Sequence, residues 1–492
     1  MNTLSKTIIT LAVTFTIAWA VTRALLPTVV FGALIGIALF AKLSAPSKNP
    51  DGTTQRGTTV KKGKRQRHRR HQITLGGVPV PADIEPNHLL VSGGTGAGKS
   101  VVLGGVLATV RDRAHDRVIV VDPGGDMMSR FWRDGDTILN PLDARSVAWS
   151  PFAEMASVHD ADRLAKSMIP DVPGAGDSQQ WQLYSQALVG AVLERLRESG
   201  RATNADLLRV LTIDKSADIE ALVAGLPAQT LFDTGAAKML SSVRGIIGSY
   251  LPSYRFLPPD ASASAFSLRR WVVEGSGWLW MPVRDDMMDA VRPLIAAWIG
   301  EAVSAALSQA PDPQRRLWLV LDELAALGRV QSLSSALTKG RKFGLCTVAG
   351  LQTIAQLKEI YGPFGAQVLL SCFSSQLLLR APDPDTARWC SDSIGQRHVI
   401  RKVSSESQNP GGGGNSESDQ HAIEAAVLPS EMQNLAKLQG FLRLADAPAI
   451  LRIRLKWVPR PAVAEPFISR RITTAQRPLD IRKPSDTGEW GA

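Results

Sequence analysis

Short apolar runs alternate with longer amphipathic segments along much of the chain. Runs without a charged residue lie at 89–92 (LLVS), 118–121 (VIVV), 278–283 (WLWMPV), 317–321 (LWLVL) and 345–351 (LCTVAGL). Continuous apolar runs of this length are typical of parallel strands that are buried on both faces, and the segments between them have helical spacing. The pattern predicts an α/β domain with a parallel sheet, formed by residues 74–150 and 265–458.

Residues 151–264 interrupt this alternation, because they have helical spacing and almost no strand pattern. Apolar residues recur at intervals of three or four from Trp181 to Leu196, which places them on one helical face. The segment has ten Lys/Arg and thirteen Asp/Glu, a balance of −3, so its overall charge does not mark a DNA-binding surface. We expect an inserted all-α domain with its own apolar core.

The N-terminus carries two further apolar runs, 7–22 and 25–41, of 16 and 17 residues. As one helix they would extend ~52 Å, well beyond a hydrocarbon core of about 30 Å. We therefore expect residues 1–45 to form two transmembrane helices, with both ends in the cytoplasm because lysines flank the pair. The tripeptide at 18–20 (AWA) also resembles a signal-peptide cleavage site, although cleavage there would leave the second run as an anchor.

The net charge of +11 is concentrated in one segment. Residues 42–71 contain ten Lys/Arg and one acid, or +9, which leaves about +2 for all other residues. A protein that binds nucleic acid over its whole surface would distribute its positive charge more widely. We interpret residues 46–73 as a basic juxtamembrane linker. The sequence alone leaves two functions open for it: attraction to anionic lipid, or a positively charged ring for nucleic acid near a membrane pore.

Two other segments have the composition of flexible chain, and the cysteines give no sign of a metal site. Residues 404–420 are low-complexity and predict a flexible loop, and residues 459–492 predict a flexible C-terminal tail without a core. Cys346, Cys372 and Cys390 show neither CxxC spacing nor a His cluster. We expect reduced cysteines packed in the core, and no zinc site.

The run at 89–92 leads directly into GGTGAGKS, which has the complete spacing of a phosphate-binding loop between a strand and a helix. Glycines allow backbone N–H groups to turn toward phosphates at a helix N-terminus. Lys99 is expected to reach the β and γ phosphates of ATP, and the Ser100 hydroxyl to ligate Mg²⁺. The predicted ATP-binding residues are Gly93, Gly94, Thr95, Gly96, Ala97, Gly98, Lys99 and Ser100.

Two other predicted strands end in carboxylates. Asp322 is followed by Glu323, and such an acid pair supplies both a Mg²⁺ partner and a carboxylate that orients the attacking water. Asp122 is followed by Pro-Gly-Gly-Asp, and we expect it to cap that turn at a neighbouring strand end, with a role near the nucleotide as the alternative. We assign catalysis to Asp322 and Glu323 and the metal site to Ser100 and Asp322.

Gln352 and Arg341 each have two interpretations. Gln352 ends a predicted strand, where it either senses the γ phosphate or caps the following helix. Arg341 lies in a basic loop (TKGRK), which is either solvated or reaches the nucleotide of a neighbouring subunit.

Several of these segments together resemble one known family. HLLVSGGTGAGKS, VIVVDPGGDM, ILNPLDAR, LWLVLDELAALGRV, ALTKGRKFGL and VAGLQT are similar to the type IV coupling proteins of bacterial conjugation, in the TrwB/TraD group. The resemblance covers nearly the whole chain. It implies a RecA-like ATPase domain that assembles as a hexameric ring on the bacterial inner membrane and binds single-stranded DNA without sequence preference.

The resemblance also implies roles for individual residues. It makes Asp322 the metal-side acid and Glu323 the water-activating acid. It makes Arg341 the finger supplied to the adjacent subunit, and Gln352 the residue that couples nucleotide state to DNA. The phosphate-binding loop keeps the roles given above.

Two classes of function follow. In the favoured one, a membrane-anchored DNA-dependent ATPase recruits a relaxase–DNA complex and drives single-stranded DNA toward a type IV secretion channel. In the alternative, the protein is a receptor and scaffold for protein substrates, and ATP binding is an assembly switch. The acid pair disfavours the alternative, because a switch needs no positioned water. A chromosome translocase of the FtsK type would need more membrane spans, and an ABC-type ATPase an LSGGQ-like segment that the sequence lacks.

Overall fold

The computed structural model describes residues 53–171, 177–233, 236–407 and 414–470, together with positions 10, 12–14 and 16. The chain divides into a small unit, Met1–Gly57 with Arg397–Glu424, and a large unit, Thr58–Gln396 with Ala425–Ala492. The predicted transmembrane hairpin lies outside the described residues except for those five positions.

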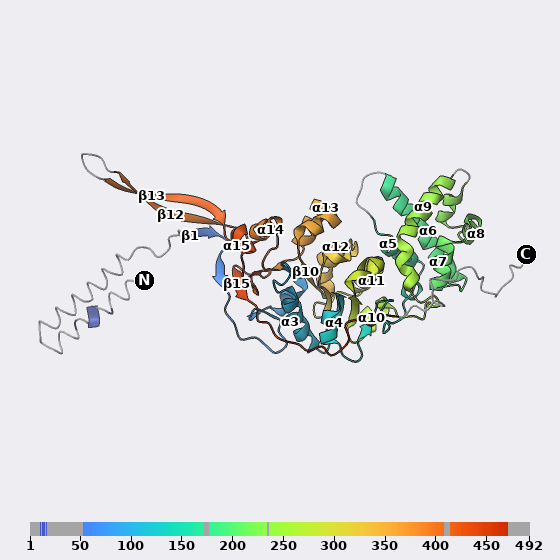
Figure 1. The fold of residues 1–492 in the computed structure, drawn as a ribbon, viewed down its shortest axis with the longest axis horizontal. Coiled ribbons are helices and arrows are strands. Elements are labelled where there is room, and N and C mark those ends of the chain that lie inside the picture. Colours follow the sequence, from blue (N-terminus) through green and yellow to red (C-terminus); the bar gives the residue numbers. More distant parts are fainter. Residues whose placement is uncertain are drawn as a thin grey trace, which may run out of the picture. The chain divides into compact units, whose positions relative to one another are not determined.

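The strands and helices follow one another as shown in Figure 1. The strands are β1 (Thr53–Gly57), β2 (Val60–Lys62), β3 (Thr74–Leu75), β4 (Val78–Pro79), β5 (Leu89–Ser92), β6 (Arg117–Pro123), β7 (Thr137–Ile138), β8 (Leu279–Val283), β9 (Leu317–Leu321), β10 (Leu345–Leu351), β11 (Ser375–Leu378), β12 (Gln396–Ser407), β13 (Gly414–Ala425), β14 (Gln439–Arg443) and β15 (Ile450–Arg454). The α-helices are α3 (Lys99–Arg111), α4 (Asp126–Phe131), α5 (His159–Met168), α6 (Asp177–Glu198), α7 (Asn204–Thr212), α8 (Ser216–Leu222), α9 (Ala237–Tyr250), α10 (Leu268–Glu274), α11 (Met288–Leu307), α12 (Ser332–Lys339), α13 (Ile354–Ser371), α14 (Pro384–Ile394) and α15 (Pro429–Gln433).

One ten-stranded sheet organises the large unit, in the order β2-β15-β14-β11-β5-β10-β9-β6-β8-β7. The neighbours from β11 to β7 pair in parallel. At the other end β14 pairs antiparallel with β11 and β15, and β2 joins β15 in parallel. The predicted α/β parallel sheet is therefore confirmed, and five strands that the apolar runs did not predict extend it: β7 at one end, and β11, β14, β15 and β2 at the other.

Alternate residues of the parallel strands face two separate hydrophobic clusters. In β6, Val118 and Val120 pack with side chains of α3 and α4, whereas Ile119 and Val121 pack with side chains of α5, α6 and α11. Because successive strand residues point to opposite faces, a strand without charges requires helices on both sides. Cys346 is fully buried in the first of these clusters.

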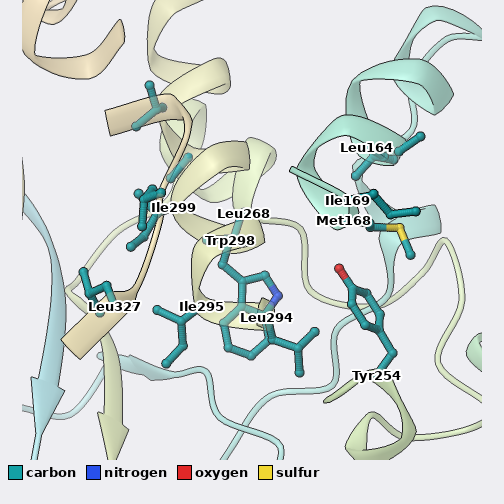
Figure 2. Close-up of a cluster of buried hydrophobic side chains, with 14 of the residues drawn as sticks. Leu164, Met168, Ile169, Tyr254, Leu268, Leu294, Ile295, Trp298, Ile299 and Leu327 are labelled. Carbon is teal, nitrogen blue, oxygen red and sulfur yellow. The ribbon is translucent and has the colours of Figure 1, made fainter. Parts of the chain in front are cut away.

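Between β7 and β8 the described residues form the helices α5 to α10 and no strand, as predicted from their periodicity. Their core is continuous with that of the sheet. Leu164 and Met168 of α5, together with Tyr254, lie close to Leu294 and Trp298 of α11 (Figure 2), and all five belong to one buried cluster. The limits 151–264 of a separate domain therefore stay a prediction.

Glu154 joins the two ends of this helical segment. Its carboxylate, with the residue only 1% exposed, accepts four hydrogen bonds. The donors are Trp149 Nε1 (2.8 Å), Ser267 Oγ (3.0 Å), and the backbone N–H groups of Leu268 (2.7 Å) and Arg269 (2.9 Å). A buried carboxylate with this many donors fixes where the chain leaves the sheet and where it returns.

The small unit contains the three-stranded sheet β1-β12-β13. The predicted flexible loop at 404–420 is wrong for most of its length, because β12 runs to Ser407 and β13 begins at Gly414. Glu424 pairs with Arg397 (3.0 Å) and Arg401 (2.8 Å) across the two strands. The low-complexity composition concealed a hairpin that is held by backbone pairing and cross-strand charges.

The basic linker and the predicted flexible tail both contain residues that pair with other parts of the large unit. Within the basic linker 46–73, β2 adds to the edge of the sheet beside β15. In the predicted tail, Val463 donates a backbone hydrogen bond to Ser129 (2.7 Å) and Arg470 donates one to Leu142 (2.8 Å). The expectation of a flexible tail thus fails for residues 459–470, and residues 471–492 lie outside the described part.

Within the described ranges, one helical stretch, Asp285–Leu307, is long and apolar enough to cross a membrane by length and composition. Most of it is buried, because α11 packs in the core beside α5, α10 and α12.

Candidate nucleotide-binding site

The glycine-rich loop connects the end of β5 to the start of α3, as predicted. Gly96 and Gly98 have φ of 72° and 123°, in a region that other residues rarely adopt. A Cβ at Gly93 would lie 2.8 Å from the Leu379 Cβ, so the loop also packs tightly against the chain after β11. Val101 and Val102 donate the first hydrogen bonds of α3 to the Gly98 carbonyl, so the N–H groups of Lys99 and Ser100 before them are the ones available to an anion.

Lys99 connects this loop to the acid pair. Its Nζ donates to the Gly93 carbonyl at 2.9 Å and forms an ion pair with Glu323 Oε2 at 3.3 Å. The two side chains are 13% and 21% exposed, so the pair is largely buried but still accessible to solvent. Residues 224 positions apart in the sequence thus meet, because β5 and β9 are parallel and their carboxyl ends lie at the same edge of the sheet.

Asp322 lies directly after β9, between the ends of β6 and β10. A Cβ at Gly350 would be 2.0 Å from the Asp322 carbonyl, and the Leu324 N–H donates to the Gly350 carbonyl at 2.8 Å. Burial raises the pKa of Asp322 from 3.8 to about 6, although Lys99 opposes the rise. Glu323 and Asp126 add to the negative charge around it. A divalent cation would neutralise this excess of carboxylates, so the donor set fits Mg²⁺.

Gln352 contacts both the loop and the acid pair. Its side-chain Nε2 donates to Thr95 Oγ1 at 2.9 Å, and its backbone N–H donates to Glu323 Oε1 at 3.3 Å. Thr353 is the residue that caps α13, since its hydroxyl accepts from the Gln356 N–H. The helix-capping interpretation of Gln352 is therefore wrong, and its amide faces the phosphate-binding loop instead.

The sequence of this chain matches a model of one protein family over most of its length. The sequence model of the type IV secretion-system coupling protein DNA-binding domain matches residues 72–456. The chain belongs to this family.

The coupling-protein assignment agrees with individual relatives. Coupling protein TraD of Escherichia coli K12 is 28% identical over 409 residues, which is 81% of this chain and 57% of TraD, so the chain spans little more than half of that relative. The solved structure of the conjugative coupling protein TrwBΔN70 is 36% identical, with a TM-score of 0.77 over 85% of this chain and 97% of that one. A TrwB structure in complex with ADP and Mg²⁺ is also 36% identical, with a TM-score of 0.76 over 85% and 98%. The chain has the α/β nucleotide-binding fold of these proteins.

Arg341 is the one predicted site residue of the coupling protein that lies away from the others. It is exposed, in a short 3₁₀ turn (Gly340–Phe343) immediately before β10. Gln352 follows the other end of the same strand, and seven residues at about 3.3 Å each separate the two ends by ~23 Å. Arg341 therefore lies at the opposite edge of the sheet from the phosphate-binding loop of its own chain.

Asp122 lies one strand from Asp322 and is fully buried. Its Oδ2 accepts from the Met128 N–H at 2.7 Å, and so it caps α4 rather than the turn itself. Within the described residues its Oδ1 has no hydrogen-bond partner. Burial raises the pKa of this carboxyl to about 7.

Tyr361 makes two contacts that the sequence did not predict. Its hydroxyl accepts from the Val330 N–H at 3.0 Å and lies 3.4 Å from the Gly328 carbonyl, in the loop after the acid pair. The next residue, Gly362, breaks the helical geometry of α13 with φ 74°. The first part of α13 thus follows Gln352, which contacts the candidate site, and ends at Tyr361, which contacts the loop after the acid pair.

Proposed function

We propose that the chain is a DNA-dependent ATPase that binds ATP with Mg²⁺. The observation that carries the proposal is the meeting of Lys99, Glu323 and Gln352 at one edge of the parallel sheet. This edge is where open α/β sheets bind ligands, and the coupling-protein family and its nucleotide-bound member support the same function.

In this proposal each residue has a distinct role. Lys99 neutralises charge on the β and γ phosphates, and in doing so it releases Glu323 from their ion pair. The freed Glu323 carboxylate orients the attacking water, and Gln352 senses the γ phosphate from its contact with Thr95. Mg²⁺, when bound, supplies further charge neutralisation between the phosphates, and Ser100 and Asp322 are the residues that hold it.

The position of Arg341 supports an oligomeric ATPase. An exposed guanidinium at the far edge of the sheet cannot reach the nucleotide of its own chain, but it can complete the site of an adjacent subunit. We propose a ring, with six subunits as in the implied family arrangement, in which Arg341 acts in trans.

The wider assignment follows the family. We propose that residues 1–45 anchor the chain in the bacterial inner membrane as two transmembrane helices, with a RecA-like domain (74–150 and 265–458) in the cytoplasm. The helical insertion (151–264) belongs to that cytoplasmic part. The proposed partners are single-stranded DNA, bound without sequence preference, a relaxase–DNA complex and a type IV secretion channel.

The test is ATP turnover by the full-length chain in neutral detergent, measured against protein concentration with and without single-stranded DNA. Turnover should rise steeply with concentration and with DNA, and Lys99→Ala and Glu323→Gln should abolish it. The ATP-switched scaffold would be favoured instead by either of two results. One is turnover per subunit that changes neither with protein concentration nor with DNA, and the other is DNA transfer that survives Glu323→Gln.

A mixing experiment tests the trans role of Arg341. Lys99→Ala and Arg341→Ala subunits should each be inactive, with Arg341→Ala lowering turnover ~10³-fold. Mixed before assembly in equal amounts, they should recover about a quarter of the wild-type rate, because one interface in four then pairs an intact loop with an intact arginine. Recovery is impossible if Arg341 acts within its own chain.

A further inference from the structure

A basic cavity lies on the flank of α3, away from the acid pair. Its volume is about 710 Å³, and it is lined by the segment 65–77, by one side of α3 and by the segment 454–460. It therefore combines the basic linker with the chain that follows β15, two parts of the sequence almost 400 residues apart. The cations that line it are Arg65, Arg69, Arg70, Arg454, Lys456 and Arg460.

The charge of the cavity is not compensated. Asp112 is the one acid among the lining residues, and it pairs with Arg133 outside the lining at 3.7 Å. Of the six cations, only Arg460 has a ring contact, with Phe131 at 5.4 Å, and none forms an ion pair within the described part of the chain. Six cations that converge without acids make a site for an anion.

The backbone of the basic segment is fixed in place, although its side chains are exposed. The Gln66 N–H donates to the Gly77 carbonyl at 3.1 Å, and Arg113 Nε donates to the His71 carbonyl at 2.9 Å. Gly77 has φ 83°, and a Cβ there would be 2.9 Å from Arg65 Cγ, so the turn requires glycine to let the Arg65 stem pack. The backbone that carries Arg65, Arg69 and Arg70 is thus held along the cavity before any ligand arrives.

The rest of the lining favours a lipid phosphate over a nucleic acid. Surfaces that bind single strands combine cations with aromatic side chains on which bases stack, and this lining contains no Phe, Tyr or Trp. Its uncharged part is mixed: Leu75, Val101 and Leu455 are aliphatic, and Gln72, Thr74 and Thr109 are polar. A phospholipid carries an anionic phosphate, polar glycerol ester groups and apolar acyl chains, and so it offers a partner to the cations, the polar side chains and the aliphatic side chains of this lining.

We propose that this cavity binds the phosphate of an acidic phospholipid headgroup. The choice of a lipid source rests on the proposed membrane anchor, since the basic segment begins shortly after the predicted transmembrane run ends at residue 41. The cavity itself stands on geometry alone, and a free phosphate shares the same chemistry. Bound lipid would lie against the helix that begins at Lys99, on the side opposite the parallel strands.

Gly105 provides a clean way to block the cavity. It lines the cavity from the middle of α3, and a Cβ there would meet nothing within 4 Å. Gly105→Phe therefore fills the space without changing charge, and it removes a poor helix former from a helix interior. Gly248→Phe is the matched control, because Gly248 is an exposed glycine within α9 that also has nothing within 4 Å.

The experiment follows the thermal unfolding midpoint of the full-length chain in neutral detergent, without nucleotide. The additives are dioctanoyl phosphatidylglycerol, dioctanoyl phosphatidylcholine, inorganic phosphate and a twenty-nucleotide oligo(dT). Phosphatidylglycerol should raise the midpoint of the wild type and of Gly248→Phe in a saturable way, through binding to the native state. Gly105→Phe should need at least about tenfold more of this lipid for the same rise in the midpoint, which corresponds to a loss of ~1.4 kcal/mol of binding free energy.

A second variant tests the charge. Arg69→Gln with Arg70→Gln should weaken the response as Gly105→Phe does, while Lys238→Gln with Lys358→Gln, two exposed lysines outside the lining, should not. The proposal is overturned if phosphatidylcholine acts as strongly, if Gly105→Phe responds like the wild type, or if inorganic phosphate matches the lipid. It is also overturned if oligo(dT), and not the lipid, loses its effect in Gly105→Phe. Because no ATP is present, failure here leaves the ATPase proposal untouched.

Discussion

Replacing Glu154 by Gln tests how firmly the helical segment is joined to the sheet. The wild-type carboxylate accepts two hydrogen bonds on each oxygen, from Trp149 and Leu268 on one and from Ser267 and Arg269 on the other. Glutamine keeps one acceptor oxygen and places an NH₂ group where the other stood. The Ser267 hydroxyl can rotate to accept from that NH₂, but the Arg269 N–H cannot.

The expected loss in the free energy of unfolding follows from the hydrogen bonds that each variant keeps. Glu154→Gln leaves the Arg269 N–H without an acceptor and removes the negative charge from the three remaining hydrogen bonds, which together lower the free energy of unfolding by about 3 kcal/mol. Glu154→Ala leaves all four donors unpaired beside a cavity and should lower it by about 5 kcal/mol or more. Glu220→Gln, at an exposed position in α8, should change it by less than about 0.5 kcal/mol.

The assay is urea unfolding of the full-length chain in detergent, together with hydrogen exchange at the Leu268 and Arg269 amides. Local protection there should fall by about a hundredfold in Glu154→Gln. If Gln and Ala variants lose the same small amount, below about 1 kcal/mol, another group must satisfy these donors and the reasoning is refuted.

Three further predictions concern the candidate site. Gly350→Ala should abolish nucleotide binding, measured by calorimetry, because its Cβ would stand 2.0 Å from the Asp322 carbonyl and force the acid pair to move. Asp122→Asn should alter the pH dependence of stability. Burial raises the pKa of Asp122 to about 7. The contribution of this carboxyl to the free energy of unfolding is therefore full below pH 4 and is lost as the pH rises through 7. Between pH 5 and 8, the free energy of unfolding of Asp122→Asn, measured with urea, should therefore rise relative to that of the wild type by up to ~4 kcal/mol. Tyr361→Phe should lower the free energy of unfolding by about 1–2 kcal/mol, because the Val330 N–H loses its acceptor, and an unchanged urea midpoint would contradict this.

The strand ends explain why much of the site could be predicted from the sequence. A run such as LWLVL followed by two acids marks both a buried parallel strand and the edge at which it ends, so Glu323 and Lys99 were expected to meet before any pairing was known. The pairing of Gln352 with Thr95 was not predictable, because it depends on β10 being the direct neighbour of β5. Spacing along the sequence carries no information about strand order.

The structure of segments without a buried face could not be predicted, for a different reason. Hydrophobic alternation appears only where one side of a strand is covered, and the strands β12 and β13 expose residues such as Ile423, 73% exposed. The extended chain at 459–470 is held by backbone hydrogen bonds, which any sequence can form. The cavity on α3 needs three segments to converge, and only the structure shows that they do.

The distance between Lys99 and Glu323 along the chain has a consequence for synthesis. At about 5–20 residues per second, the 224 positions between them take a ribosome ~11–45 s to translate. During that time the strand before the loop also lacks both of its sheet neighbours, since β10 and β11 are made later still. A nascent chain therefore carries the glycine-rich loop beside an unpaired strand edge, which is an aggregation hazard and not a partial enzyme. Pairing of β5 on both sides has to wait for residue 378, so chaperone binding to the emerging chain should matter most before that point.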